Sequence, residues 1–343
     1  MGPTAAGKTD FAISIAERFG GELISVDSAL VYRGLDIGAA KPDYPHHLID
    51  IRDPAEPYSA MDFARDAEQT IADVRRRGRL PILVGGTMLY YRALLQGLDD
   101  IPASDPDLRA DIEREALELG WPAMHSQLSL VDPVLAARLH PNHSQRIGRG
   151  LEVFRMTGKP LSDWQQGMAE PKVKGPVIAL AVCPQERRVL HQRIEQRFDQ
   201  MLALGLVDEV RRLFDRGDLS PDLPALRAVG YRQLWSFLQG DINLEHARDQ
   251  GIAATRQLAK RQLTWLRRWP GLYWLLTDSR GGLVAIEPGA AAEQSVAIGS
   301  DNWSALIGSI ASRVPTDANL TEDDELMGFL SQYLGNSIDF QTS

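Results

Sequence analysis

One glycine-rich segment at the start of the chain limits what the protein can fold into. Residues Gly2–Thr9 match the pattern G-x-x-x-x-G-K-[ST]. Helical periodicity follows over Lys8–Phe19, and then a short apolar strand over Glu22–Val26. A glycine-rich turn that opens a helix leaves backbone N–H groups free to surround an anion, and the helix dipole adds positive potential there. The segment therefore predicts a phosphate-binding loop in a fold that combines strands and helices.

This loop, known as a P-loop, requires a phosphorylated ligand. Its N–H groups surround phosphate, Lys8 neutralises phosphate charge, and the Thr9 hydroxyl can hold Mg²⁺. We therefore expect Mg²⁺ as cofactor, with Thr9 as the metal-binding residue. Most P-loop proteins bind a nucleotide such as ATP and transfer or hydrolyse its γ-phosphate, so a small-molecule kinase is one alternative. The candidate diphosphate-binding residues of the loop are Gly2, Thr4, Ala5, Ala6, Gly7, Lys8 and Thr9.

The position of the loop in the chain is unusual. A P-loop normally follows a buried strand, whereas here Met1 directly precedes Gly2. We therefore expect the first strand of the sheet to be absent, either because the true start lies upstream or because the chain is truncated. Loss of a central strand leaves neighbouring backbone groups unpaired, so we expect reduced activity. A noncatalytic RNA-binding protein is accordingly a second alternative.

Apolar runs of strand length alternate with helical patterns. Leu80–Val84 is a second predicted strand, preceded by the helical Ser59–Arg77, and a third is predicted at Val177–Val182. Strands that alternate with helices form parallel sheets covered on both faces. The expected fold class is α/β, a P-loop NTPase-like parallel sheet flanked by helices, with an inserted all-helical domain.

The expected domain boundaries follow from the same patterns. Helical signals without a strand fill residues 103–172, and amphipathic helices follow the third strand as far as Trp269. Beyond residue 280 the chain is rich in glycine, alanine, serine and acids, with weak periodicity until a predicted helix at Glu322–Tyr333. The predicted domains are an α/β core over 1–102 and 173–280, a helical insertion over 103–172, and an acidic, weakly ordered tail over 281–343.

The net charge of −9 argues at first against a nucleic-acid partner, because phosphate contacts need cations. Residues 281–343 hold nine acids against the single base Arg313, which leaves the rest of the chain nearly neutral. The densest basic cluster suits a phosphate backbone, although a solvated helix face would look the same. The opposite side of that helix, with Leu258, Trp265 and Trp269, is expected to be core. The cluster consists of Arg256, Lys260, Arg261, Arg267 and Arg268.

The sequence shows no sign of a membrane segment or a secretion signal. It contains no apolar run long enough to span a bilayer and no basic N-terminal stretch before an apolar one. We therefore expect a cytoplasmic protein. We also expect a monomer. The lone Cys183 is expected to be a buried residue at a strand end rather than a nucleophile. Two histidine pairs, His46 with His47 and His140 with His143, lack a third ligand and are expected to be structural.

Several consecutive segments resemble the tRNA dimethylallyltransferase family, and the resemblance covers essentially residues 2–275. Together these segments are far more specific than the P-loop. They are Ser25–Gly34, Leu35–Pro42, His46–Ile51, Val84–Tyr90, Gln145–Val153, Arg193–Gly205, Arg227–Arg232 and Ala254–Arg267.

The resemblance implies a prenyl transfer from dimethylallyl diphosphate to an anticodon-loop adenosine. By position alone, Asp27 could be a magnesium ligand or a general base. The family implies that Asp27 takes the proton of the weakly nucleophilic adenine amine, and that Asp27, Thr87 and Lys8 form the catalytic set. It also implies that Arg197, with Arg193 as second choice, stabilises the departing pyrophosphate. Surface ion pairs remain the alternative for both arginines.

The resemblance further implies a tRNA partner whose target base leaves its stack. The product would be N6-(dimethylallyl)adenosine at position 37 of tRNAs that read codons starting with U, and the helical insertion would contact the anticodon stem. A related alternative is an adenylate isopentenyltransferase, which prenylates a free nucleotide. The implied tRNA-binding residues are Asp27, Ser28, Ala29, Leu30, Thr87, Arg109, Gln145, Arg146, Arg149, Arg227, Gly230, Tyr231, Arg232, Arg256, Lys260 and Arg261.

Overall fold

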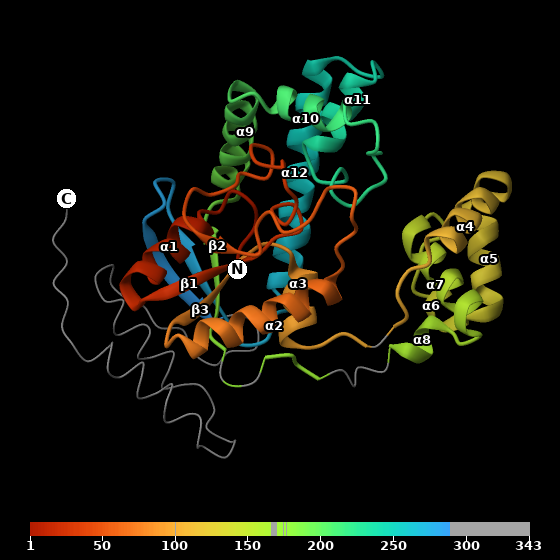
Figure 1. Cartoon of the computed structure of the whole chain (residues 1–343), viewed down its shortest axis with the longest axis horizontal. Helices are drawn as coiled ribbons and strands as arrows, with labels where there is room; N and C mark the ends of the chain where they lie inside the picture. The colour runs from red at the N-terminus through yellow and green to blue at the C-terminus, as the bar shows by residue number, and fades with distance from the viewer. Residues whose placement is uncertain (100, 166–169, 174, 176, 289–343) are drawn as a thin grey trace. The chain divides into compact units, whose positions relative to one another are not determined.

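The computed structural model describes residues 1–99, 101–165, 170–173, 175 and 177–288. The chain divides into two compact units, and Figure 1 shows the elements of both. One unit combines Met1–Leu94 with Val173–Ser343 and contains all the strands of the described residues. The other, Leu95–Lys172, contains helices and no strand among its described residues. The predicted α/β fold with an inserted all-helical domain is confirmed.

The α/β unit holds two three-stranded sheets. The first has the order β2-β1-β3 and is fully parallel, with Ser25 of β1 opposite Val84 of β3. The second has the order β4-β5-β6, in which β4 and β5 are parallel and β5 and β6 antiparallel. The strands are β1 (Gly21–Val26), β2 (His46–His47), β3 (Leu80–Gly85), β4 (Ala179–Pro184), β5 (Leu272–Thr277) and β6 (Leu283–Pro288).

The start of the chain is hydrogen-bonded to the second sheet. The amino group of Met1 donates to the carbonyl oxygen of Leu180 over 2.8 Å, and the N–H of Val182 donates to the carbonyl oxygen of Met1 over 3.1 Å. The phosphate loop therefore leaves from the edge of β4. By contrast, the loops that follow β1 and β3 belong to the first sheet.

Seven helices accompany the strands among the described residues of this unit. Both α1 and α2 pack against β1 and β3. Ala12 and Ala16 of α1 join Leu23 and Val84 in one buried cluster, because small residues let the helix approach the sheet closely. The helices are α1 (Lys8–Phe19), α2 (Ala60–Arg76), α3 (Met88–Leu95), α9 (Arg187–Ala203), α10 (Leu206–Phe214), α11 (Tyr231–Leu238) and α12 (Leu244–Leu266).

The helical unit has its own apolar core, formed by residues such as Met124, Leu128 and Ile147. A Cβ at Gly150 would lie 2.8 Å from side-chain atoms of both Leu128 and Leu135, so glycine allows close helix packing there. This contact offsets the cost of a glycine inside a helix. The helices are α4 (Pro106–Leu119), α5 (Trp121–Val131), α6 (Pro133–Ala136), α7 (Ser144–Thr157) and α8 (Leu161–Trp164).

Three further expectations from the sequence concern membrane segments, Cys183 and the acidic tail. Among the described residues, no helix is both long and apolar enough to cross a membrane. Cys183 is buried near the end of β4, as expected, and burial raises the pKa of its thiol to about 11. Strand β6 lies inside the range assigned to the acidic tail. The rest of that range, including the predicted helix at Glu322–Tyr333, lies outside the described residues.

Glu22 ties β1 to its surroundings and predicts a pH-dependent stability. Its carboxylate accepts a hydrogen bond from Arg77 over 2.7 Å and lies 2.7 Å from Nε2 of His47. The hydrogen bonds of Arg77 and His47 lower the pKa of Glu22 from 4.5 to about 2. Because the folded-state pKa is depressed, the stabilisation is present above pH 4.5 and is lost as the pH falls toward 2. Glu22→Gln should lower the free energy of unfolding by about 1 kcal/mol at neutral pH, since the group is partly exposed.

Urea unfolding at neutral pH and at pH values between 4.5 and 2 tests this prediction. The difference between wild type and Glu22→Gln should shrink across that window. Glu17→Gln, at an exposed position of α1, is the control and should change stability little at any pH. A difference for Glu22→Gln that stays constant down to the lowest pH would contradict the assignment.

Candidate functional site

The phosphate loop ends in the uncapped start of a helix. Ala5 and Gly7 have left-handed backbone angles, with φ of 62° and 85°, and α1 begins directly after Gly7. No side chain caps this helix start, so its first N–H groups remain available to an anion. A Cβ at Gly2 would lie 2.7 Å from the carbonyl oxygen of Val182, so a glycine is needed beside β4. The local geometry is that of an anion-binding loop.

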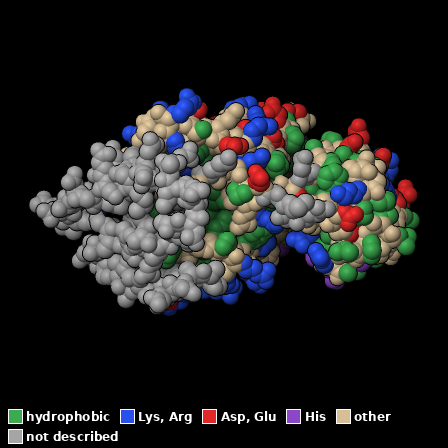
Figure 2. All heavy atoms as spheres, turned by 90° about the horizontal axis from the view of Figure 1, so that it is seen from below, with side chains coloured by type: hydrophobic (Ala, Val, Ile, Leu, Met, Phe, Trp, Pro, Cys, Tyr) green, Lys and Arg blue, Asp and Glu red, His purple; other side chains and the backbone are tan. Residues whose placement is uncertain are grey.

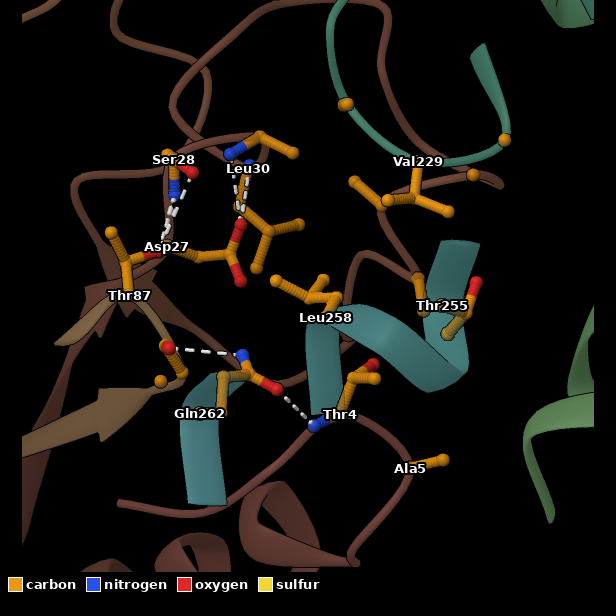
Figure 3. A pocket seen from close by; sticks show the side chains of 18 of the residues that line it. Thr4, Ala5, Asp27, Ser28, Leu30, Thr87, Val229, Thr255, Leu258 and Gln262 are labelled. Atoms are coloured by element: carbon orange, nitrogen blue, oxygen red, sulfur yellow. Dashed lines mark hydrogen bonds between the residues drawn. The ribbon is translucent and has the colours of Figure 1, made fainter. Parts of the chain in front are cut away.

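The loop opens into a cavity of about 530 Å³ within the α/β unit. The loops that follow β1 and β3 form a second side of the cavity, and residues of α9 and α12 form a third. Figure 3 shows part of this lining, including Thr4 of the loop, Asp27 after β1 and Leu258 of α12. The lining residues that the sequence analysis had selected are Thr4, Ala5, Lys8, Thr9, Asp27, Ser28, Ala29, Leu30, Thr87, Arg197, Arg227, Gly230 and Arg261.

Two half-buried cations, Lys8 and Arg197, line this cavity near Asp27. Burial lowers the pKa of Lys8 to about 8. The negative charge of Asp27 raises this pKa, and the positive charge of Arg197 lowers it further. Burial also lowers the pKa of Arg197, again against the pull of Asp27. Among the described residues Arg197 has no hydrogen-bond or ion-pair partner, and Lys8 donates only a long bond of 3.4 Å to the carbonyl oxygen of Pro3. The structure thus brings Lys8, Arg197 and Asp27 together and leaves positive charge for an anionic ligand.

The second arginine that the sequence analysis considered points elsewhere. Arg193 donates to the carbonyl oxygens of Asp278 and Ser279, over 3.2 and 3.1 Å, and does not line the cavity. Of these two candidate arginines, only Arg197 lines the cavity.

The carboxylate of Asp27 is held in a fixed orientation at the end of β1. Its Oδ1 accepts hydrogen bonds from the N–H groups of Ala29 and Leu30, over 2.8 and 3.3 Å. Within the described chain Oδ2 accepts no hydrogen bond, and Figure 3 shows the carboxylate facing the pocket. The hydroxyl oxygen of Thr87 accepts the N–H of Ser28 over 3.1 Å, which places Thr87 next to Asp27. One carboxylate oxygen is thus positioned and the other is available for a proton.

The structure adds Gln262 of α12, which sequence reasoning had not singled out. Its Oε1 accepts the N–H of Thr4 over 2.9 Å, and its Nε2 donates to the carbonyl oxygen of Gly86 over 2.9 Å. Gln262 is only 8% exposed, so both ends of the amide are satisfied inside the protein. The signal in the sequence was a single polar residue on the buried side of a helix, between Ala259 and Leu266.

The expectation that the apolar side of α12 is core is only partly correct. Trp269, just beyond the helix, is buried, but Leu258 and Trp265 line the cavity, and Trp265 is 39% exposed. Ile194 and Phe198 of α9 extend this apolar wall. Periodicity could not distinguish a face that packs on the core from one that lines a pocket, because both need apolar residues. The cavity is therefore cationic at the phosphate loop and apolar along α9 and α12.

Tyr231 does not reach the surface, contrary to its expected contact with tRNA. It is fully buried, and its hydroxyl donates to Glu209 of α10 over 2.6 Å. Glu209 also accepts the N–H groups of the backbone at residues 36–38, over 2.7–3.1 Å. Because Gly38 lines the cavity, Tyr231 and Glu209 hold one of its walls. The neighbouring Arg232 is exposed.

The basic cluster on α12 contains paired and unpaired cations. Arg256 forms an ion pair with Glu195 of α9 over 2.8 Å. Lys260 and Arg261 are exposed and form no ion pair with any described residue. On the face that Figure 2 shows, basic and acidic side chains are interspersed over the described residues, so local rather than net charge must guide a polyanion.

In the helical unit the candidate residues differ in how free they are. Arg109 forms an ion pair with Glu113 over 3.5 Å, whereas Gln145 and Arg146 are exposed at the start of α7. Arg149 points inward, contrary to its expected phosphate contact: it lies 3.0 Å from the buried Glu152 and donates to the carbonyl oxygen of Pro102. The three-residue spacing of Arg146 and Arg149 placed both on one helical face, but it could not show that Arg149 pairs with the buried Glu152.

Comparisons with known proteins point to one family. A sequence model of the family described as IPP transferase matches residues 30–269. The tRNA dimethylallyltransferase of Thiobacillus denitrificans is 55% identical over 302 residues, covering 84% of this chain and 96% of the relative. That of Bordetella pertussis is 57% identical over 277 residues, covering 78% and 88%. The crystal structure of the tRNA isopentenylpyrophosphate transferase of Bacillus halodurans matches with a TM-score of 0.56 and 41% identity, over 80% of this chain and 88% of that one. The chain therefore belongs to the IPP transferase family, as the resemblance in its sequence predicted.

Proposed function

We propose that the protein is a tRNA dimethylallyltransferase. It transfers the dimethylallyl group of dimethylallyl diphosphate to N6 of adenosine 37, in the anticodon loop of tRNAs that read codons starting with U. The observation that carries this proposal is the arrangement of one cavity, with the half-buried cations Lys8 and Arg197 beside the phosphate loop and the oriented carboxylate of Asp27 nearby. The names of the close relatives favour this function over a kinase or a transferase for free nucleotides.

The phosphate loop and Arg197 bind the diphosphate of the donor. The bond between C1 of the dimethylallyl group and the diphosphate oxygen breaks, and the departing pyrophosphate gains negative charge. Lys8, Arg197 and the first N–H groups of α1 stabilise that charge in a cavity from which water is partly excluded. The apolar wall around Phe198 and Leu258 suits the five-carbon group.

The acceptor adenine approaches from the side of Asp27. As the new bond forms between N6 and C1, the amine loses a proton, and Oδ2 of Asp27 accepts it. The N–H groups of Ala29 and Leu30 hold Oδ1, so the carboxylate does not have to reorient during the reaction. The Thr87 hydroxyl accepts the N–H of Ser28, the neighbour of Asp27, and in this proposal Thr87 contacts the base.

The cavity also fits Mg²⁺. This ion prefers oxygen ligands and usually combines one or two protein oxygens with water and substrate phosphates. The Thr9 side chain lines the cavity beside the phosphate loop, and the described residues contain no group of three or more histidine, cysteine or acidic side chains that would form a closed metal site. When bound beside Thr9, Mg²⁺ would neutralise charge on the diphosphate.

The tRNA is bound outside the cavity by exposed cations. Arg227 and Arg261 line the cavity and are exposed, and Arg232 and Lys260 are exposed on α11 and α12. The target nucleotide must leave its stack to reach Asp27, which contacts around the opening make possible. We propose that the helical unit contacts the anticodon stem through Arg146 and Arg109. We further propose that the protein acts on tRNA in the cytoplasm, as a monomer.

The central test combines labelled dimethylallyl diphosphate, Mg²⁺ and unmodified tRNA with the wild-type chain and with Asp27→Asn. Wild type should transfer label to tRNA. Asp27→Asn should lower the single-turnover rate about 100- to 10,000-fold, because a neutral amide cannot accept the proton. Asp215→Asn, at an exposed position just beyond α10, is the matched control and should retain the rate. Transfer to AMP but not to tRNA would reject the substrate, and an undiminished rate for Asp27→Asn would reject the base.

The depressed pKa of Lys8 predicts how donor binding depends on pH. Since that pKa is about 8, Lys8 is charged below this pH and loses its proton above it. The affinity for inorganic pyrophosphate should therefore fall as the pH rises through 8, by up to about tenfold per unit. Lys8→Arg, which keeps its charge, should lose less. Calorimetric titrations of both proteins across this pH range measure the two affinities. The ionisation of pyrophosphate affects both proteins equally, so it drops out of the ratio of the affinities. Parallel pH dependences in the two proteins would contradict the prediction.

The unpaired Lys260 should contribute to tRNA affinity through counterion release. Lys260→Ala should weaken tRNA binding and reduce the slope of log K against log salt concentration by about 0.7 to 0.9. Arg248→Ala removes a cation of the same helix that already pairs with Asp199 over 2.6 Å, so its slope should stay close to that of wild type. Filter binding at several salt concentrations measures both. Equal slopes for wild type and Lys260→Ala would show that Lys260 makes no contact with a tRNA phosphate.

A further inference from the structure

We infer that Gln262 is a positioning residue that sets the spacing between the diphosphate loop and the catalytic Asp27. The inference rests on the proposed function and adds a residue to its machinery. Gln262 lines the same cavity but its amide is used entirely on the protein: one end binds Thr4 of the phosphate loop and the other binds Gly86 after β3. Figure 3 shows both hydrogen bonds on α12, between the two loops.

The two loops that Gln262 joins belong to different sheets. The phosphate loop starts at Met1, which is hydrogen-bonded to β4 of the second sheet. Gly86 follows β3, which pairs with β1 in the first sheet. Among the described strands no pairing connects the two sheets, so strand-to-strand hydrogen bonds do not set the distance between the sheets at the cavity. The Gln262 side chain supplies a direct hydrogen-bonded link in its place.

From Gly86 the link continues to the catalytic carboxylate. Thr87 follows Gly86 in the chain, and its N–H donates to the carbonyl oxygen of Val26, the last residue of β1. Its hydroxyl oxygen accepts the N–H of Ser28, which is the neighbour of Asp27. The path Thr4, Gln262, Gly86, Thr87, Ser28 therefore runs from the donor end of the cavity to the acceptor end through four adjoining contacts or peptide bonds.

Only a side chain with a donor and an acceptor at this distance can make both contacts. A methionine has neither, and a glutamate carboxylate can accept from Thr4 but cannot donate to Gly86 unless it is protonated. The neighbouring backbone has no spare room: a Cβ at Gly86 would lie 2.4 Å from Nε2 of Gln262. The glycine and the glutamine therefore fit one another, and the contact brings α12 directly against the end of β3.

The consequence for the reaction lies in the rate of transfer. The donor carbon and the acceptor nitrogen must approach within about 3–3.5 Å in the correct direction, and a misplacement of about 1 Å can cost about 100-fold in rate. Gln262 does not need to touch either substrate to affect this distance, because each substrate binds to a loop that Gln262 holds. Its loss should lower the rate of the chemical step more than the affinity for either substrate.

The first experiment compares Gln262→Met and Gln262→Glu with Gln257→Met, which changes an exposed glutamine of the same helix. At saturating dimethylallyl diphosphate and tRNA, Gln262→Met should lower the single-turnover rate about 10- to 100-fold. Dissociation constants for inorganic pyrophosphate and for tRNA should change less than about threefold, well below the effect on the rate. Gln257→Met should match wild type in rate, binding and melting temperature.

A pH profile separates positioning from a loss of packing. Protonated glutamic acid has one donor and one acceptor, as glutamine does, and burial favours the protonated form. The rate of Gln262→Glu, divided by that of wild type, should therefore recover as the pH falls. A residue that only fills space would show a constant ratio.

A second readout does not depend on the identity of the acceptor. Hydrogen exchange with and without inorganic pyrophosphate should show protection at the phosphate loop and also at residues 27–30 in wild type. In Gln262→Met the protection should be confined to the phosphate loop. Equal protection of residues 27–30 in both proteins, or a rate for Gln262→Met equal to that of wild type, would overturn the inference. A wild-type chain that shows this protection pattern but does not modify tRNA would instead reject the proposed function.

Discussion

The half-buried cations Lys8 and Arg197 share a cavity with one carboxylate, Asp27, and this imbalance of charge underlies the chemistry of the site. Lys8 and Arg197 both have lowered pKa values because burial disfavours their charged forms. Among the described lining residues Asp27 is the only acid, and its Oδ1 is already held by two backbone N–H groups. Keeping two cations away from water costs free energy that an anionic ligand offsets when it enters. The cavity therefore favours a diphosphate over a neutral ligand before any shape is considered.

Helix α12 shows how one element can serve three purposes through its different faces. Gln262 points between two loops, Leu258 and Trp265 line the apolar wall, and Lys260 is exposed to solvent. A helix of 23 residues is long enough to carry these faces past the cavity, and its start is capped by the side chain of Asn243. The basic cluster seen in the sequence is therefore only the outer face of a helix whose inner face belongs to the site.

Much of the fold was visible in the sequence because its signals are local. The phosphate loop, the helix after it and the strands at Glu22–Val26 and Leu80–Val84 all appear close to their predicted positions, as β1 and β3. The two-residue strand β2 was not predicted because its pairing with β1 is a long-range contact with no periodicity of its own. The division into two sheets likewise depends on pairings that no local pattern encodes.

The candidate site could be predicted where the type of a residue and its motif indicate a direct contact with a ligand. Lys8, Asp27, Thr87 and Arg197 do line one cavity. Residues whose side chains bind a partner inside the protein were harder to predict. Tyr231 is directed inward by Glu209, which lies outside the segment Arg227–Arg232. Arg149 is directed inward by Glu152 on the same helix, whose burial depends on the packing of the helical unit. Gln262 was missed for the same reason, because its role is defined by two backbone groups far away in the chain.

Glu209 has a further consequence for ligand entry. By accepting three N–H groups of residues 36–38 and the hydroxyl of Tyr231, it fixes one wall of the cavity when the chain folds. The conformational entropy of that wall is therefore lost once, during folding, and is not lost again at each encounter with a substrate. A site arranged in this way can bind a flexible RNA loop with most of the ordering confined to the RNA.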